Sequence, residues 1–413
     1  MMLSDQKLIL NLLTPEAVRL RCHEMLEMAK SDALEHFKFH PENLKSATEY
    51  VLEEIKSNYP DGHVPFHSRW RHFEFGTHNL WQELFRQKSG LSFAERARRR
   101  IDLAIISVLL DAGAGANWQY EDAETGLIYR RSEGLALASL RLFESGVLSQ
   151  YGRDDPLRVD AGRLTTITAN DIAQAFQVTD TNPIIGLEAR TDLLNRLGVR
   201  LSAADHAFGR AGDIRPGNLF DHLISRQVGD TLKAREILVT LLVELGEIWP
   251  EGEMINGISV GDVGHHRNII RNDITNGVLP FHKLSQWMAY SLIEPLKEAD
   301  ITVVDLDDLT GLAEYRNGGL FMDTKTISLR NQANADMEHD PKSELVVEWR
   351  ALTIALLDKI TASLRQHMDK DPASLPLASV LEGGTWSAGR RLANQLRVNG
   401  RPPIRINSTG TIF

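Results

Sequence analysis

Hydrophobic residues recur every three to four positions along much of the chain, which is the spacing of amphipathic helices. The first such segment begins at Thr14 and Pro15, an N-cap followed by a proline in the first turn. A second segment with the same spacing follows Pro41. Together they predict an N-terminal helical hairpin over residues 1–60, followed by a main helical domain over residues 61–413 that encloses the active site.

Capping residues and apolar stripes predict further helices downstream. Residues 92–95, Ser-Phe-Ala-Glu, form a capping box. A long apolar stripe predicts a helix that begins near Pro341, and Pro295 is expected to bend or end the helix that precedes it. Other helix starts are predicted at Ser132, Thr168, Asn182-Pro183 and Thr385.

Strand signals are short and few. They predict a hairpin within residues 118–129, a strand at residues 301–304 and another at residues 404–406. No Pro-, Ser- or Gly-rich linker and no low-complexity tract divides the sequence. The expected fold class is therefore mainly α, a compact multi-helix bundle with a few short strands.

The composition narrows the classes of function. Hydrophobic residues make up 42% and charged residues 25%, as in ordinary soluble proteins. The net charge of −10 argues against non-specific nucleic-acid binding, which needs a basic surface. Cys22 is the only cysteine, so an intramolecular disulfide and a thiolate metal site are excluded. The longest apolar run, residues 103–110, is too short to span a bilayer, and no secretory leader pattern is present. We expect a cytoplasmic protein that binds neither nucleic acid nor membrane.

The densest chemistry lies in residues 304–323, where acidic residues, a tyrosine and an arginine stand among leucines. The spacing of residues 309–320 predicts a helix, and the glycine pair at 318–319 is expected to mark its end. Glu314 lies at the border of the apolar stripe, close to Arg316. Such a carboxylate can act as a general base or stabilise a carbocation-like sugar. The alternative is a surface helix whose Glu and Arg are solvated.

Two other segments have the composition of pocket walls. Residues 64–74 mix aromatic, basic and acidic side chains without a helical or strand period, and planar Arg and Trp side chains can hold a planar ligand. The alternative is a loop pinned by Arg–Glu pairing. Residues 112–121 bring small residues, two aromatics and a carboxylate together. The candidate binding residues in these segments are Arg69, Trp70, Arg71, Glu74, Trp118 and Tyr120.

Residues 279–287 resemble the start of the first of these segments, with Pro-Phe-His followed by a tryptophan. Glu348 falls on the apolar stripe of the predicted long helix, so it must be paired or serve a site. His265 and His266 are adjacent, cannot share one helix face and have no acid at ligand spacing. No metal site is predicted from them.

Seven stretches of the chain carry a resemblance to one known family. They are residues 65–74, 111–115, 131–136, 280–287, 314–319, 348–352 and 381–386, which together span nearly the whole chain. They resemble a family of unknown function in fungal and bacterial proteins linked to uracil catabolism, of the type of yeast uracil catabolism protein four. The resemblance implies a role in a pyrimidine degradation route that runs through a ribosylated intermediate and releases urea.

A shorter similarity concerns residues 309–316 and, downstream, residues 344–350. These are similar to queuosine salvage nucleoside glycosidases, which have Ala-Asp-Tyr-Arg and then Glu-x-Glu-Ile-Arg. The similarity implies a fold that resembles helical DNA glycosylases, with Glu314 standing where that family has Asp.

The two resemblances, taken with the placement of Glu314, imply an N-glycoside hydrolase that acts on a ribosyl-urea or on a small molecule resembling a uracil nucleoside or nucleotide. No metal or redox cofactor is expected, and a homodimer is compatible with the sequence. The alternatives are another hydrolytic or ring-opening step of the same pathway, and a non-catalytic nucleotide-binding or scaffold protein. The candidate catalytic acids are Glu314, Asp305 and Asp308. The further candidate substrate-binding residues are His282, Lys283, Tyr315, Arg316, Glu348, Arg350 and Trp386.

Overall fold

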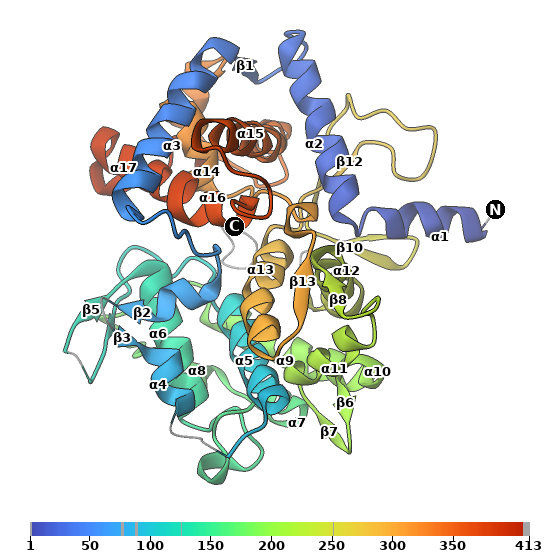
Figure 1. Ribbon diagram of the computed structural model, residues 1–413, viewed down its shortest axis with the longest axis vertical. Helices are drawn as coiled ribbons and strands as arrows, with labels where there is room; N and C mark the ends of the chain where they lie inside the picture. The colour runs from blue at the N-terminus through green and yellow to red at the C-terminus, as the bar shows by residue number, and fades with distance from the viewer. Residues whose placement is uncertain (1, 76–77, 87–89, 125, 251, 408–413) are drawn as a thin grey trace. The chain divides into compact units, whose positions relative to one another are not determined.

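The computed structural model describes residues 2–75, 78–86, 90–124, 126–250 and 252–407 (Figure 1). Helices dominate the described chain, and its strands occur as short two-stranded pairs, which confirms the mainly α fold class. The chain divides into two compact units. Among the described residues, unit 1 contains 2–67, 252–286 and 305–407, and unit 2 contains 68–250 and 287–304.

Unit 1 is built around the long helix α15. Helix α2 packs along α15, α14 packs against both α15 and α17, and β1 pairs antiparallel with β14. The elements of unit 1 are α1 (Met2–Asn11), α2 (Pro15–Lys30), β1 (Phe37–Phe39), η1 (Pro41–Asn43), α3 (Leu44–Asn58), β9 (Glu253–Ile255), β10 (Ile258–Gly261), β11 (Val263–His265), β12 (Val278–Pro280), η6 (Leu306–Asp308), α14 (Tyr315–Asp323), β14 (Ile327–Leu329), η7 (Gln332–Ala335), β15 (Glu338–His339), α15 (Glu344–Met368), α16 (Leu377–Val380), the π-helical segment η8 (Leu381–Trp386), α17 (Ser387–Leu396), η9 (Val398–Gly400) and β16 (Arg405–Ile406).

Unit 2 is a set of shorter helices packed around α5, and its strand β8 pairs in parallel with β13. Helix α13 (Lys283–Glu298) begins in unit 1 and continues into unit 2. The other elements of unit 2 are η2 (Arg69–Phe73), β2 (Glu74–Phe75), β3 (His78–Asn79), α4 (Leu80–Arg86), α5 (Phe93–Leu109), β4 (Tyr120–Glu121), β5 (Ile128–Tyr129), α6 (Arg131–Glu144), η3 (Gly152–Asp154), α7 (Ala161–Leu164), α8 (Ala169–Ala175), α9 (Leu187–Ala203), α10 (Asp205–Phe208), β6 (Gly209–Arg210), β7 (Asp213–Ile214), η4 (Pro216–Asn218), α11 (Leu219–Ile224), β8 (Thr231–Lys233), α12 (Ala234–Leu245), η5 (Gly246–Ile248) and β13 (Thr302–Val304).

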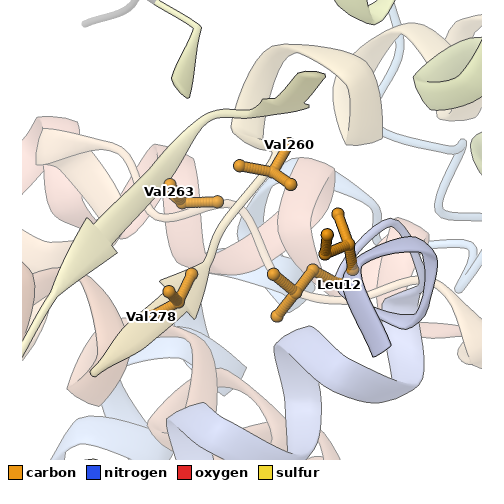
Figure 2. Packing of buried hydrophobic residues seen from close by; sticks show 5 residues of the cluster. Leu12, Val260, Val263 and Val278 are labelled. Carbon is orange, nitrogen blue, oxygen red and sulfur yellow. The ribbon is translucent and has the colours of Figure 1, made fainter. Parts of the chain in front are cut away.

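The N-terminal residues are fixed to unit 1 by a compact apolar cluster. Leu12 packs against Val260, Val263 and Val278, which come from β10, β11 and β12, and all four side chains are at most 5% exposed (Figure 2). Burial of such side chains is the main favourable term in folding. The predicted hairpin of residues 1–60 therefore lies inside unit 1.

Local signals located several helices correctly. The Thr14 side chain accepts a hydrogen bond from the N–H of Ala17, Ser92 accepts one from Glu95, and Thr168 forms a full capping box. The strands predicted near residues 120–129, 302–304 and 405–406 are all present. Thr125, in the predicted hairpin, lies outside the described residues. In the part of the chain that the structure describes, no helix is long and apolar enough to cross a membrane.

Two predictions about the acidic stretch were wrong. The helix does not run from residue 309, because Glu314 has an extended backbone (φ −114°, ψ 165°) and α14 begins only at Tyr315. The glycine pair at 318–319 lies inside α14 and does not end it. A Cβ at Gly318 would stand 2.8 Å from ring atoms of Trp349, so glycine is required there for close packing against α15.

Four other predicted boundaries also differ from the structure. Thr385 does not cap a new helix, because the chain passes through η8 into α17 without a break. Helix α9 begins at Leu187 and not near Asn182, whose amide instead bonds the backbone of Gln119 and Gln177. Ser132 lies one residue inside α6. Helix α13 continues three residues beyond Pro295, so the proline does not end it, and the alternative expectation of a bend stays a prediction.

Candidate active site

Glu314 is the N-cap of α14 and is 9% exposed. Its two carboxylate oxygens accept backbone N–H groups, one from Arg316 at 2.7 Å and one from Asn317 at 2.5 Å. Burial raises the pKa of this carboxyl, although the two hydrogen bonds and the charge of Lys283 oppose the shift. Shorter side chains are the usual N-caps, so a buried glutamate here is unusual. Each oxygen retains a lone pair that can face a ligand.

A charged network lies at the start of α13, in the same unit. Asp262 accepts two hydrogen bonds from Arg350, at 2.8 and 2.6 Å, and one from the N–H of Lys283 at 3.0 Å. Burial opposes ionisation of Asp262, but the charge and hydrogen bonds of Arg350 and the N–H of Lys283 together outweigh burial and lower the pKa of the carboxyl. The guanidinium of Arg350 also stacks 4.1 Å from the ring centroid of Phe281. Asp262 thus holds Arg350 in place and also binds the backbone of Lys283, the residue whose charge acts on Glu314.

His282 is enclosed by this network and is 1% exposed. Its Nε2–H donates to the carbonyl of Leu12 at 2.8 Å, and its buried Nδ1 has no hydrogen-bond partner. Burial lowers the pKa of His282, so the ring is held neutral. These contacts are those of a structural histidine that fastens the N-terminal segment.

Glu348 is fully buried on α15 and pairs with backbone groups. Its carboxylate accepts the N–H groups of Glu35, His36 and Phe37 at 3.0 to 3.2 Å, and His266 lies 3.2 Å away. The buried acid expected on this stripe is therefore paired, and its partners belong to the segment that leads into β1.

The remaining candidates of the acidic stretch lie around α14. Arg316 donates to the carbonyl of Gly400 at 2.7 Å and stacks on Tyr315, whose side chain is partly exposed. Asp305 is exposed and has a left-handed backbone (φ 55°), and Asp308 is half-buried. Among these four residues, Arg316 acts electrostatically on the pKa of Glu314.

A histidine–carboxylate pair that the sequence did not single out lies next to α14. His67 Nδ1 and Glu382 Oε2 are 2.6 Å apart, with side chains 6% and 15% exposed. The Trp386 ring lies 6.3 Å from the His67 ring. Glu382 and Trp386 both belong to the π-helical segment η8, a rare conformation that often occurs at functional sites. A Cβ at Gly389, one turn further, would collide with the carbonyl oxygen of Arg316, so α17 packs directly on the first turn of α14.

Unit 2 contains a second cluster of candidates around Arg69, which is fully buried. Its guanidinium donates to Asp111 at 2.6 Å and to Ser107 at 2.6 Å, and it stacks 5.5 Å from the centroid of Trp287. Ser132 donates to the other oxygen of Asp111 at 3.3 Å. Burial lowers the pKa of Arg69. Side chains from four of the family-like motifs meet here.

The neighbouring candidate residues in unit 2 form hydrogen bonds and ion pairs within the fold. Arg71 donates to Glu74 at 2.8 Å and to Glu294 at 2.5 Å, which supports the alternative of a loop pinned by Arg–Glu pairing. The indoles of Trp70 and Trp118 are each 1% exposed and donate to the carbonyls of Ser291 and Phe176. Tyr120 is 6% exposed and lies 6.5 Å from Trp118. The binding roles of these side chains stay predictions.

One group of side chains has the spacing of metal ligands. Ligand atoms of Glu35, His36 and Glu344 lie within 4.8 Å of one another. Arg267 pairs with both glutamates and already supplies positive charge. Exposed acidic groups are common without an ion, so the arrangement alone indicates no metal centre.

The candidates thus fall into the two units. Unit 1 contains Glu314, Asp305, Asp308, His282, Lys283, Tyr315, Arg316, Glu348, Arg350 and Trp386. Unit 2 contains Arg69, Trp70, Arg71, Glu74, Trp118 and Tyr120. Sequence reading missed Asp262, His67 and Glu382, because their partners lie far away along the chain.

Comparison with known proteins places the chain in a family. A profile described as "Protein of unknown function (DUF1688)" matches residues 11–413. The chain belongs to this family. The DUF1688 match includes every residue of the two clusters described above.

Two curated relatives are similar to this DUF1688 chain over almost their entire lengths. It is 37% identical over 412 residues to Protein urg3 of Schizosaccharomyces pombe, which covers 98% of this chain and 99% of that protein. It is 36% identical over 410 residues to Uracil catabolism protein 4 of Lachancea kluyveri, with 92% of each chain covered. The family resemblance seen in the motifs is confirmed.

Proposed function

We propose that this protein acts in uracil catabolism as an N-glycoside hydrolase, with a ribosyl-urea or a uracil nucleoside or nucleotide as substrate. The pathway rests on the full-length similarity to the relative named Uracil catabolism protein 4. The reaction type rests on Glu314, a buried carboxylate whose two oxygens are fixed by backbone N–H groups.

Cleavage of an N-glycosidic bond requires a carboxylate held close to the ribose. When the bond between C1′ of the ribose and nitrogen breaks, its electron pair leaves with the nitrogen, and positive charge develops on the ribose. A fixed carboxylate stabilises that charge and accepts one proton of the water whose oxygen bonds to C1′, while the leaving nitrogen takes up a proton from solvent. The raised pKa of Glu314 makes the carboxylate a stronger base for this step. The charges of Lys283 and Arg316 act on this carboxyl and favour its ionised form.

The first experiment measures turnover. The purified protein is incubated with uridine, uridine monophosphate and ribosylurea, and released base, urea and reducing sugar are assayed. Glu314→Gln should lower kcat by at least about 100-fold while changing KM little, because the lost interaction acts mainly in the transition state. Glu27→Gln is the control, since Glu27 is exposed and pairs with Lys30 on the surface.

The outcomes separate the alternatives. Turnover that persists in Glu314→Gln removes Glu314 from the mechanism. Binding of one of these ligands without turnover, in the wild-type protein, favours a non-catalytic nucleotide-binding or scaffold protein.

A further inference from the structure

A cavity of about 220 Å³ lies in unit 2, between the first turns of α5 and the end of α13. It belongs neither to the Glu314 network nor to the Arg69 cluster. Its lining residues are Phe93, Arg96, Ala97, Arg100, Pro295 and Glu298.

Two guanidinium groups line this cavity. Arg96 and Arg100 are four residues apart on α5 and therefore lie on the same face of the helix. The Nε atom of each is buried and has no hydrogen-bond partner. Burial, followed by the charge of Arg96, lowers the pKa of Arg100 to about 10. Two like charges in a half-buried position destabilise each other unless an anion lies between them.

Carboxylates compensate the charge of Arg100, because Glu298 forms an ion pair with it and Glu294 also acts on it electrostatically. The guanidinium of Arg100 also stacks 4.2 Å from the centroid of Trp81. Arg96 stacks 4.9 Å from the ring of Phe93, and no ion pair or side-chain hydrogen bond joins its guanidinium to any residue that the structure describes. The lining therefore carries one uncompensated positive charge at Arg96.

The size of the cavity limits the ligand. It is smaller than the roughly 300–1,000 Å³ of sites that enclose drug-sized ligands, and much larger than the roughly 30 Å³ that one water occupies. Arginine is the side chain best suited to planar, two-pronged recognition of phosphate oxygens. The exposed ring of Phe93 and the ring of Pro295 offer apolar surface at the same place.

We propose that this cavity binds an oxyanion, the phosphate group of a small metabolite or inorganic phosphate itself, between Arg96 and Arg100. The site does not depend on the hydrolase proposal, because Glu314 contributes nothing to it.

The test measures binding on the full-length protein by isothermal titration calorimetry, with ionic strength held constant by sodium chloride. The probes are inorganic phosphate, ribose 5-phosphate and, as the neutral comparison, ribose. Phosphate should bind, and Arg96→Gln should weaken that binding at least about tenfold. Arg96→Lys keeps the positive charge but loses the two-pronged guanidinium, so its affinity for phosphate should lie between those of the wild type and Arg96→Gln. Arg196→Gln is the matched control, since Arg196 is exposed and pairs with Asp192.

The comparison of probes identifies the source of the oxyanion. Tighter binding of ribose 5-phosphate than of phosphate supports a phosphorylated metabolite, and the reverse supports free phosphate. Absence of phosphate binding overturns the proposal, and so does equal binding by wild type and Arg96→Gln. None of these readouts requires turnover, so failure of the hydrolase proposal is seen separately.

Discussion

The indole N–H of Trp70 donates to the backbone carbonyl of Ser291 at 2.8 Å, and Ser291 lies one helical turn before Pro295 in α13. In a regular helix that carbonyl would accept the N–H of residue 295, which proline lacks. The tryptophan therefore satisfies an acceptor that the proline leaves open. The buried position of Trp70 thus satisfies a backbone hydrogen-bond acceptor in addition to removing apolar surface from water.

This relationship predicts coupling between the two residues. Trp70→Phe should cost about 2–4 kcal/mol, since it loses volume and leaves the Ser291 carbonyl unsatisfied. In a Pro295→Ala background residue 295 donates again, so the same change should cost about 1 kcal/mol less. Urea unfolding of the four proteins gives the coupling energy. A coupling energy of zero would show that the indole hydrogen bond does not replace the missing N–H.

Glu348→Gln tests whether this acid serves the fold. The amide keeps one acceptor oxygen and turns an NH₂ group toward the N–H groups of residues 35–37, so the unfolding free energy should fall by about 2–3 kcal/mol. Glu344→Gln, one turn earlier and paired with Arg267, should cost less than about 1 kcal/mol. Equal losses in the two variants, measured by urea unfolding, would argue against the anchoring role of Glu348.

Glu314 should give stability a pH dependence of defined sign. Burial raises the pKa of Glu314 above its ordinary value of 4.5, so the folded state keeps this proton to higher pH than the unfolded chain does. The linked stabilisation is complete below pH 4.5 and is lost as the pH rises through the folded-state pKa. The side chain of the Glu314→Gln variant does not titrate. The unfolding free energy of this variant should therefore rise relative to that of the wild type as the pH rises from about 4 to 7. Denaturation curves across this range check the slope, and a constant difference would contradict it.

His282 should act in the opposite direction. Burial lowers the pKa of His282 below 6.5, so the neutral ring is favoured in the folded state. Its contribution to stability is present above pH 6.5 and is lost as the pH falls from 6.5 through the folded-state pKa. His282→Gln keeps a donor for the Leu12 carbonyl but does not titrate. A plot of melting temperature against pH should therefore be flatter below pH 6.5 for this variant than for the wild type. His265→Gln, at an exposed histidine that pairs with Glu253, is the comparison variant.

Sequence patterns predicted those parts of the fold that depend on near neighbours. The caps at Thr14, Ser92 and Thr168 were found because the side chain and the N–H that it accepts lie three residues apart. The start of α14 was misplaced because leucines before residue 314 happen to keep helical spacing while their backbone is irregular. Periodicity cannot report the extended backbone that a capping glutamate imposes.

The candidate sites depend on distant partners, which a single sequence does not reveal. Asp262 lies between β10 and β11, and its partner Arg350 is 88 residues away. His67 and Glu382 are 315 residues apart. Glu314 could be singled out from its local surroundings, but neither of these pairs has a local pattern.

The long-range contacts within unit 1 affect the order in which parts of the chain are buried during synthesis. Its N-terminal segment is completed by residues made much later, as in the bond between Phe37 and Glu348, which are 311 residues apart. At about 5–20 residues per second, a ribosome needs roughly 15–60 s to travel from α2 to α15. Through that interval the apolar faces of α2 and α3 lack their native partner α15. The first part of the chain to emerge is therefore among the last to be buried, and it is the part that a nascent-chain chaperone would shield longest.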